Sequence, residues 1–143
     1  MSKSNTAENS ILALIFNATA FADLAENDAS SPATALHVAL YTSDPGEAGA
    51  ANTNEAAYTN YARVSVNRNS GGWTVSGNAV SNTAEIAFPE CGVTGATVTH
   101  FGVCIGSSGA TVLLYSGALT ASRAISAGIT PRFAAGELDV TED

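Results

Sequence analysis

The sequence predicts a mainly β protein: a single antiparallel β-sandwich or barrel-like domain preceded by one N-terminal α-helix. Short runs that alternate apolar and polar residues recur at roughly ten-residue spacing over the last two thirds of the chain. Gly-, Asn- and Ser-rich turns separate these runs. Helical spacing of apolar residues occurs near the N-terminus. We therefore expect an arm over residues 1–9, a helix over 10–26 and a β-sandwich domain over 33–143.

The predicted helix follows a small, polar arm in which Glu8 suits a first helical turn. One apolar stripe contains Ile11, Ile15, Ala18 and Ala22. Leu14 and Phe21 lie on another side, so the apolar surface is wider than one core-facing stripe requires. Two explanations stay open: a helix buried on two sides within its own domain, or a helix that also packs on another subunit.

The run from Leu36 to Thr42 is almost entirely apolar, which predicts a strand in the centre of a sheet. A turn with Pro45 and Gly46 follows, and residues 48–57 are expected to form an exposed loop. Further strands are expected at 62–66, 73–75, 80–88, 97–105 and 112–119, with weaker ones at 123–125 and 131–134. The turn at 106–109 predicts that 97–105 and 112–119 form a hairpin. The acidic segment 137–143 is expected to be peripheral.

Charged residues make up 13% of the chain, about half the usual share. Small polar residues replace them, and such surfaces suit close contact because few charges must be desolvated. Five basic residues against 13 acidic ones give a net charge of −8, which argues against nucleic acid as a partner. The apolar run 11–16 is too short to span a bilayer and lacks the features of a secretion signal. We expect no membrane partner and synthesis in a cytoplasm without export.

No catalytic, cofactor-binding or metal-binding residues are predicted. Cys91 and Cys104 form no CxxC pair, and His37 and His100 lack acidic neighbours at ligand spacing. We expect two buried free thiols, with a disulfide as the alternative. The segment 102–106 has the outline of a nucleophile between glycines but falls inside a strand. A small hydrolase that uses Cys104 or a serine with His100 is a remote alternative.

Two further side chains have specific interpretations. Trp73 opens a strand, so we expect it in the core. Arg63 is either buried against an acid or a neighbouring chain, or solvated at a strand edge.

Five segments, taken in order, carry a resemblance to a known family. They are the turn Asp44-Pro45-Gly46, the glutamate-bearing loop 54–58, the strand Tyr61-Ala62-Arg63, the segment Trp73 to Val75 and the strand Val98 to Val103. Together they resemble small tailed-phage virion proteins of the head-decoration or tail-fibre-like group. The resemblance implies a protein that packs and assembles and is not an enzyme.

The resemblance covers about residues 36–119. Because the chain lacks a long repetitive shaft, we expect a capsid decoration or cement protein on the outer surface of the capsid in the virion. Its partners would be the major capsid protein and copies of itself. The alternative is a tail-fibre or tail-tip protein that contacts the host through exposed aromatics such as Tyr58 and Tyr61. The hypothetical interface residues are Leu14, Phe21, Asp44, Glu47, Glu55, Tyr58 and Arg63.

Overall fold

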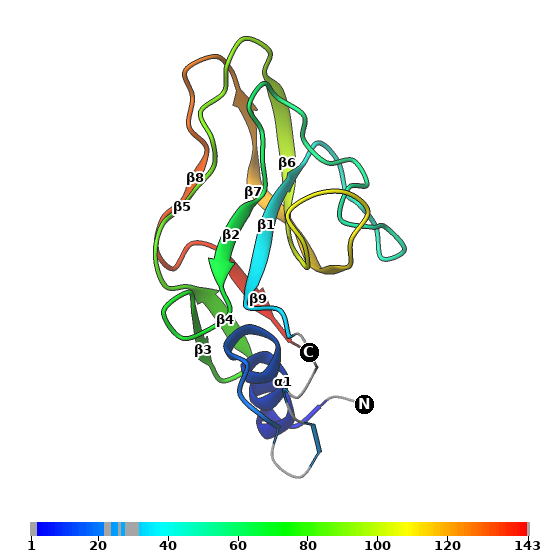
Figure 1. The fold of residues 1–143 in the computed structure, drawn as a ribbon, viewed down its shortest axis with the longest axis vertical. Coiled ribbons are helices and arrows are strands. Elements are labelled where there is room, and N and C mark those ends of the chain that lie inside the picture. The colour runs from blue at the N-terminus through cyan, green and yellow to red at the C-terminus, as the bar shows by residue number, and fades with distance from the viewer. Residues whose placement is uncertain (1–2, 22–23, 26, 28–31, 143) are drawn as a thin grey trace. The chain divides into compact units, whose positions relative to one another are not determined.

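The computed structural model describes residues 3–21, 24–25, 27 and 32–142 (Figure 1). The elements are α1 (Asn5–Asn17), β1 (Ala35–Tyr41), β2 (Val64–Asn67), β3 (Trp73–Ser76), β4 (Ala79–Asn82), β5 (Ile86–Ala87), β6 (Ala96–Cys104), β7 (Leu113–Ile125), β8 (Arg132–Phe133) and β9 (Asp139–Thr141). The strands form a four-stranded sheet in the order β2-β1-β6-β7, a three-stranded sheet β3-β4-β9 and a two-stranded sheet β5-β8. The predicted class, mainly β with antiparallel pairing and one N-terminal helix, is confirmed.

The chain divides into two compact units. The first unit comprises Met1–Ala35, Asn67–Ile86 and Phe133–Asp143, and the second comprises Leu36–Val66 and Ala87–Arg132. The sequence pattern predicted one domain over 33–143. Both units are assembled from segments far apart in the chain, and alternation along single strands carries no information about that partition.

The helix α1 begins and ends earlier than the predicted 10–26. Ser4 is the N-cap, and its side chain accepts a hydrogen bond from the Ala7 amide at 3.3 Å. Ala18 takes a left-handed conformation with φ 53° and ends the helix. Alanine normally favours helix continuation, so the sequence pattern could not locate this end. Residues 22–23 and 26 of the predicted helix lie outside the described residues.

The first unit packs α1 against β3 and β4. Glu8, Leu12 and Phe16 recur every four residues and form the buried stripe of α1. The ring of Phe16 meets Trp73 edge-on, with centroids 4.9 Å apart and planes at 69°. Trp73 is completely buried, which confirms its predicted place in the core.

The C-terminal segment contributes to this core. Its strand β9 pairs with β4, and Val140 lies opposite Val80. Leu138 is 1% exposed, and its amide donates to the buried side chain of Asn82 at 2.9 Å. The prediction that 137–143 is peripheral is therefore wrong, because two apolar side chains among acidic neighbours suffice to anchor the strand.

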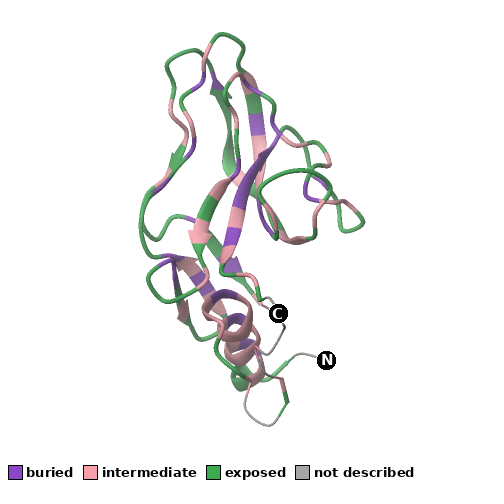
Figure 2. Ribbon diagram, in the orientation of Figure 1, coloured by how far each residue is buried: buried purple, intermediate pink, exposed green. Residues whose placement is uncertain are grey.

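The second unit is organised around β1, which lies between β2 and β6, as its apolar run predicted. Figure 2 shows the run of buried residues along β1. The predicted hairpin is also confirmed, because β6 pairs with β7. At Gly102 of β6 an added Cβ would lie 2.8 Å from the ring of Tyr41, so a larger residue would displace that ring.

We predict that Phe16→Ala lowers the free energy of unfolding by about 3–5 kcal/mol, because it leaves a cavity beside Trp73. Trp73 is the only tryptophan in the sequence, so fluorescence-monitored urea unfolding reports this unit directly. Leu24→Ala is the control, since Leu24 is 74% exposed, and it should change stability by less than about 0.5 kcal/mol. Equal losses in both variants would contradict this description of the core.

Candidate functional site

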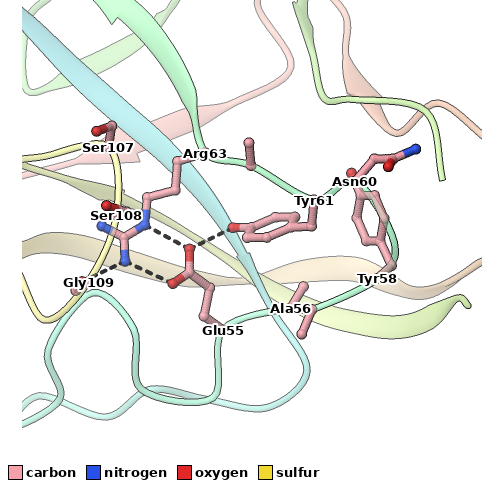
Figure 3. Close-up of a pocket in the computed structure, with 11 residues that line it drawn as sticks. Glu55, Ala56, Tyr58, Asn60, Tyr61, Arg63, Ser107, Ser108 and Gly109 are labelled. Carbon is pink, nitrogen blue, oxygen red and sulfur yellow. Dashed lines mark hydrogen bonds and ion pairs between the residues drawn. The ribbon is translucent and has the colours of Figure 1, made fainter. Parts of the chain in front are cut away.

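The second unit contains an open hollow of about 440 Å³ (Figure 3). Its walls come from the segment that precedes β2 and from the turn between β6 and β7. The lining residues are Glu55, Ala56, Ala57, Tyr58, Asn60, Tyr61, Ala62, Arg63, Ser107, Ser108 and Gly109. Three of the predicted interface residues, Glu55, Tyr58 and Arg63, therefore lie together here.

Arg63 uses every hydrogen-bond donor of its guanidinium group inside the protein. Its Nε and Nη2 donate to the two carboxylate oxygens of Glu55, at 2.7 and 2.8 Å (Figure 3). Nη1 donates to the carbonyl of Gly106 at 3.1 Å and to Thr111 Oγ1 at 3.0 Å. Nη2 also donates to the carbonyl of Gly109 at 2.8 Å. A guanidinium has five N–H donors, so none remains for an external ligand.

The ion pair between Arg63 and Glu55 is sequestered from solvent. The Arg63 side chain is 1% exposed and that of Glu55 is 16% exposed. The hydrogen bond to Glu55 raises the pKa of Arg63, so the guanidinium stays charged. The structure thus decides the alternative that the sequence left open: Arg63 is buried against an acid of its own chain. The pair ties the loop after β1 to the β6–β7 turn.

Two tyrosines beside the pair also direct their hydroxyl groups inward. The hydroxyl of Tyr61 donates to Glu55 Oε1 at 2.9 Å and accepts from the Leu40 amide at 3.1 Å. The hydroxyl of Tyr58 donates to the carbonyl of Pro89 at 3.0 Å. Tyr58 is 2% exposed, and burial raises its pKa to about 12. The expectation that Tyr58 is an exposed contact residue is therefore wrong.

Tyr61 has two aromatic neighbours. Tyr58 meets it edge-on at 5.3 Å, and Phe88 stacks on it at 6.3 Å with planes at 12°. The side chains of Arg63, Glu55 and Tyr61, which line the hollow, therefore already have polar partners within the protein.

The other predicted interface residues lie elsewhere. Asp44 and Glu47 are exposed on the loop after β1, where Asp44 Oδ1 accepts from the Gly46 amide at 2.8 Å. Leu14 and Phe21 are half-buried in the first unit. Contact with a neighbour by these residues stays a prediction.

Sequence reasoning missed Arg68, a second arginine that holds segments together. It donates to the carbonyls of Leu14 and Ile15 in the last turn of α1, and to Asn27 Oδ1 at 2.8 Å. Helix ends leave such carbonyls without intrahelical partners. Its acceptors are mostly backbone carbonyls, which have no side-chain signature in a sequence.

The thiols are both free and buried, as predicted. Sγ of Cys104 donates to the carbonyl of His37 at 3.3 Å, and burial raises the pKa of this thiol. A nucleophilic cysteine needs the opposite shift. His100 shares a 2.8 Å hydrogen bond with Thr99 through Nδ1. This environment gives no support to the remote hydrolase alternative.

Two other classes of site were sought within the described ranges. No group of three or more His, Cys, Asp or Glu side chains there could hold a metal ion. None of the helices in the described part of the chain has the length and apolarity to cross a bilayer.

These features define a structural β protein whose polar and reactive groups serve its own packing. Comparison with protein families places it more narrowly: the chain belongs to the family described as Podophage GP4 fiber I protein gp80, whose model matches residues 2–141. The resemblance to phage virion proteins is therefore confirmed. The family is one of structural fibre proteins. No curated protein matches the chain.

We predict that Arg63→Met lowers the free energy of unfolding by about 3 kcal/mol, because it removes the cation that pairs with the largely buried carboxylate of Glu55. Arg63→Lys should recover little of this loss, since one ammonium group cannot replace a planar fork of donors. Chemical denaturation measured by circular dichroism tests both variants. The matched control is Arg123→Met, at an exposed arginine of β7, and a comparable loss there would contradict the assignment.

The stability of the second unit should also depend on pH through His37. Burial and then the nearby Arg63 lower the pKa of His37. The buried Nδ1 has no hydrogen-bond partner among the described residues, so a proton there would lack an acceptor. The unfolded chain takes up this proton near pH 6.5, whereas the folded chain does so only at lower pH. Stability is thus greatest above pH 6.5 and is lost as the pH falls below it.

We expect the melting temperature to fall between pH 6.5 and 5.5, a window chosen from the ordinary histidine pKa of about 6.5. His37→Gln should flatten this dependence, and His100→Gln, as a control, should preserve it. Differential scanning calorimetry at matched ionic strength measures both. Identical slopes for wild type and His37→Gln would rule out His37 as the source.

Proposed function

We propose that the protein is a structural component of a phage fibre assembly attached to the tail. The family match over residues 2–141 carries this proposal, because it spans nearly the whole chain and its family is described as a fibre protein. The internal satisfaction of Arg63, Glu55 and Tyr61 supports it. These groups stiffen the second unit and are not exposed as a reaction site.

In this role the protein acts through surface contacts and contributes no catalysis. The two thiols are both buried, and burial raises the pKa of Cys104. Exposed loops remain for contact, and the loop after β1 presents Asp44 and Glu47 to solvent. Preorganised loops lose less entropy on association than mobile ones.

Capsid decoration is the second candidate function. It is favoured by the absence of any internal repeat in the 143 residues, since a fibre shaft is usually built from repeats. The acidic loop with Asp44 and Glu47 would then bridge capsid subunits, and many weak contacts would stabilise the shell together.

The decisive experiment is quantitative mass spectrometry of purified particles whose tails have been separated from filled heads. We expect a small number of copies, all travelling with the tails. Recovery of hundreds of copies on the heads would refute the fibre role and establish decoration. Major capsid and tail-tube proteins in the same samples calibrate the copy number and the purity of each fraction.

A further inference from the structure

Charge is distributed unevenly between the two units. The first unit has nine acidic and two basic residues, a net charge of −7, whereas the second has four acidic and three basic residues, a net charge of −1. Within the second unit, residues 91–132 contain no acidic residue at all. Two copies of a chain with net charge −8 meet less repulsion at this stretch than elsewhere.

Most of the large exposed apolar side chains belong to the same stretch of the sequence, residues 91–132. Of the five large apolar residues that are exposed among those described, four belong to it: Val93, Ile105, Val112 and Ile129. Ile105 is 41% exposed and Val112 59%, and the Ile105 amide donates to the Val112 carbonyl at 3.0 Å. The two residues therefore lie side by side, directly after the end of β6 and directly before the start of β7. Apolar surface without nearby charge is typical of protein interfaces.

The same stretch also supplies a sheet edge. The order β2-β1-β6-β7 leaves β7 at the end of its sheet, beside β6 in the hairpin seen in Figure 1. Its 13 residues contain no proline and one charge, Arg123. An edge strand is a template for another extended chain unless charges, prolines or bulges protect it. Register shifts interrupt the pairing with β6 on both sides, so the regular edge runs from Tyr115 to Ala118.

The stretch 91–132 thus lacks acidic residues, exposes apolar side chains and contains a sheet edge. From these three features we infer that β7 is a docking surface for a second copy of this chain. The two β7 strands pair antiparallel across a two-fold axis, with Tyr115 of each copy opposite Ala118 of the other. Ser116, Gly117 and Ala118 are small, so the backbones can approach closely. The same segment supplies both edge and added strand, which is the self-complementarity that a two-fold interface requires.

The exposed pair Ile105 and Val112 flanks the paired strands in each copy and adds apolar contact area at the margin of the interface. The acidic first unit keeps other surfaces apart by repulsion. This arrangement does not depend on whether the protein belongs to a fibre or decorates a head.

The first test is the mass of the full-length protein in solution, by sedimentation equilibrium over a wide concentration range. We expect the wild type to have the mass of two chains. Ser116→Glu places two carboxylates near the axis, and like charges brought together in an interface cost several kcal/mol. We expect dimerisation to weaken by at least about tenfold, which corresponds to about 1.4 kcal/mol.

The matched control is Ser76→Glu, an exposed serine on the edge strand β3 of the first unit. This variant should stay dimeric. Because Ser116 is exposed, Ser116→Glu should keep the wild-type circular dichroism spectrum, so loss of the dimer would not reflect unfolding. A monomeric wild type at high concentration, an assembly of another order, or a persistent Ser116→Glu dimer would each overturn the proposal.

The second test is site-specific crosslinking with a short bis-maleimide. The native thiols Cys91 and Cys104 are buried, so a cysteine introduced by Ser116→Cys is the accessible one. We expect covalent dimers from Ser116→Cys and few from the control Ser76→Cys. Equal yields from the two variants would show random collision and would contradict the β7 interface.

Discussion

The second unit depends on one interaction above all: the guanidinium of Arg63 held by Glu55, two backbone carbonyls and one threonine. Two segments that are distant in the sequence meet at this group: the connection between β1 and β2, which holds both Glu55 and Arg63, and the β6–β7 turn. A buried charge is costly unless its partners are complete. Here five donors meet five acceptors, so the charge specifies where both loops must lie.

This constraint also explains the character of the hollow beside it. Glu55 accepts from Arg63 and Tyr61, and Tyr61 in turn accepts from the Leu40 amide. The Tyr61 ring also packs against two aromatic neighbours, Tyr58 and Phe88. Acid, arginine and tyrosine side chains are common in active sites. Here their hydrogen bonds are made to one another and to the backbone, so they stabilise the fold. The membership in a fibre protein family agrees with that physical reading.

The first unit is stabilised by a different set of interactions. Its helix packs Phe16 on Trp73, and Arg68 satisfies carbonyls at the end of α1. Most of the acidic residues belong to this unit, whereas residues 91–132 have none. Repulsion between two copies of the chain is therefore stronger at the first unit than at residues 91–132.

The sequence by itself determined the features that are encoded in local pattern. An uninterrupted apolar run identified β1 as central, two alternating runs around a glycine turn identified the β6–β7 hairpin, and Trp73 was correctly placed in the core. Periodicity and turn chemistry act over a few residues, so they can be read directly. The expectation of two free, buried thiols, with a disulfide as its alternative, is also confirmed.

Only the tertiary structure decided the rest. Alanine at position 18 is a helix former, yet the chain turns there because packing overrides propensity. The division into two units and the buried strand β9 depend on pairing between distant segments. Glu55 and Arg63 could each have been solvated. The burial of this ion pair depends on two backbone carbonyls, 43 and 46 residues away from Arg63. Every residue has a backbone carbonyl, so the sequence does not show which ones will accept from Arg63.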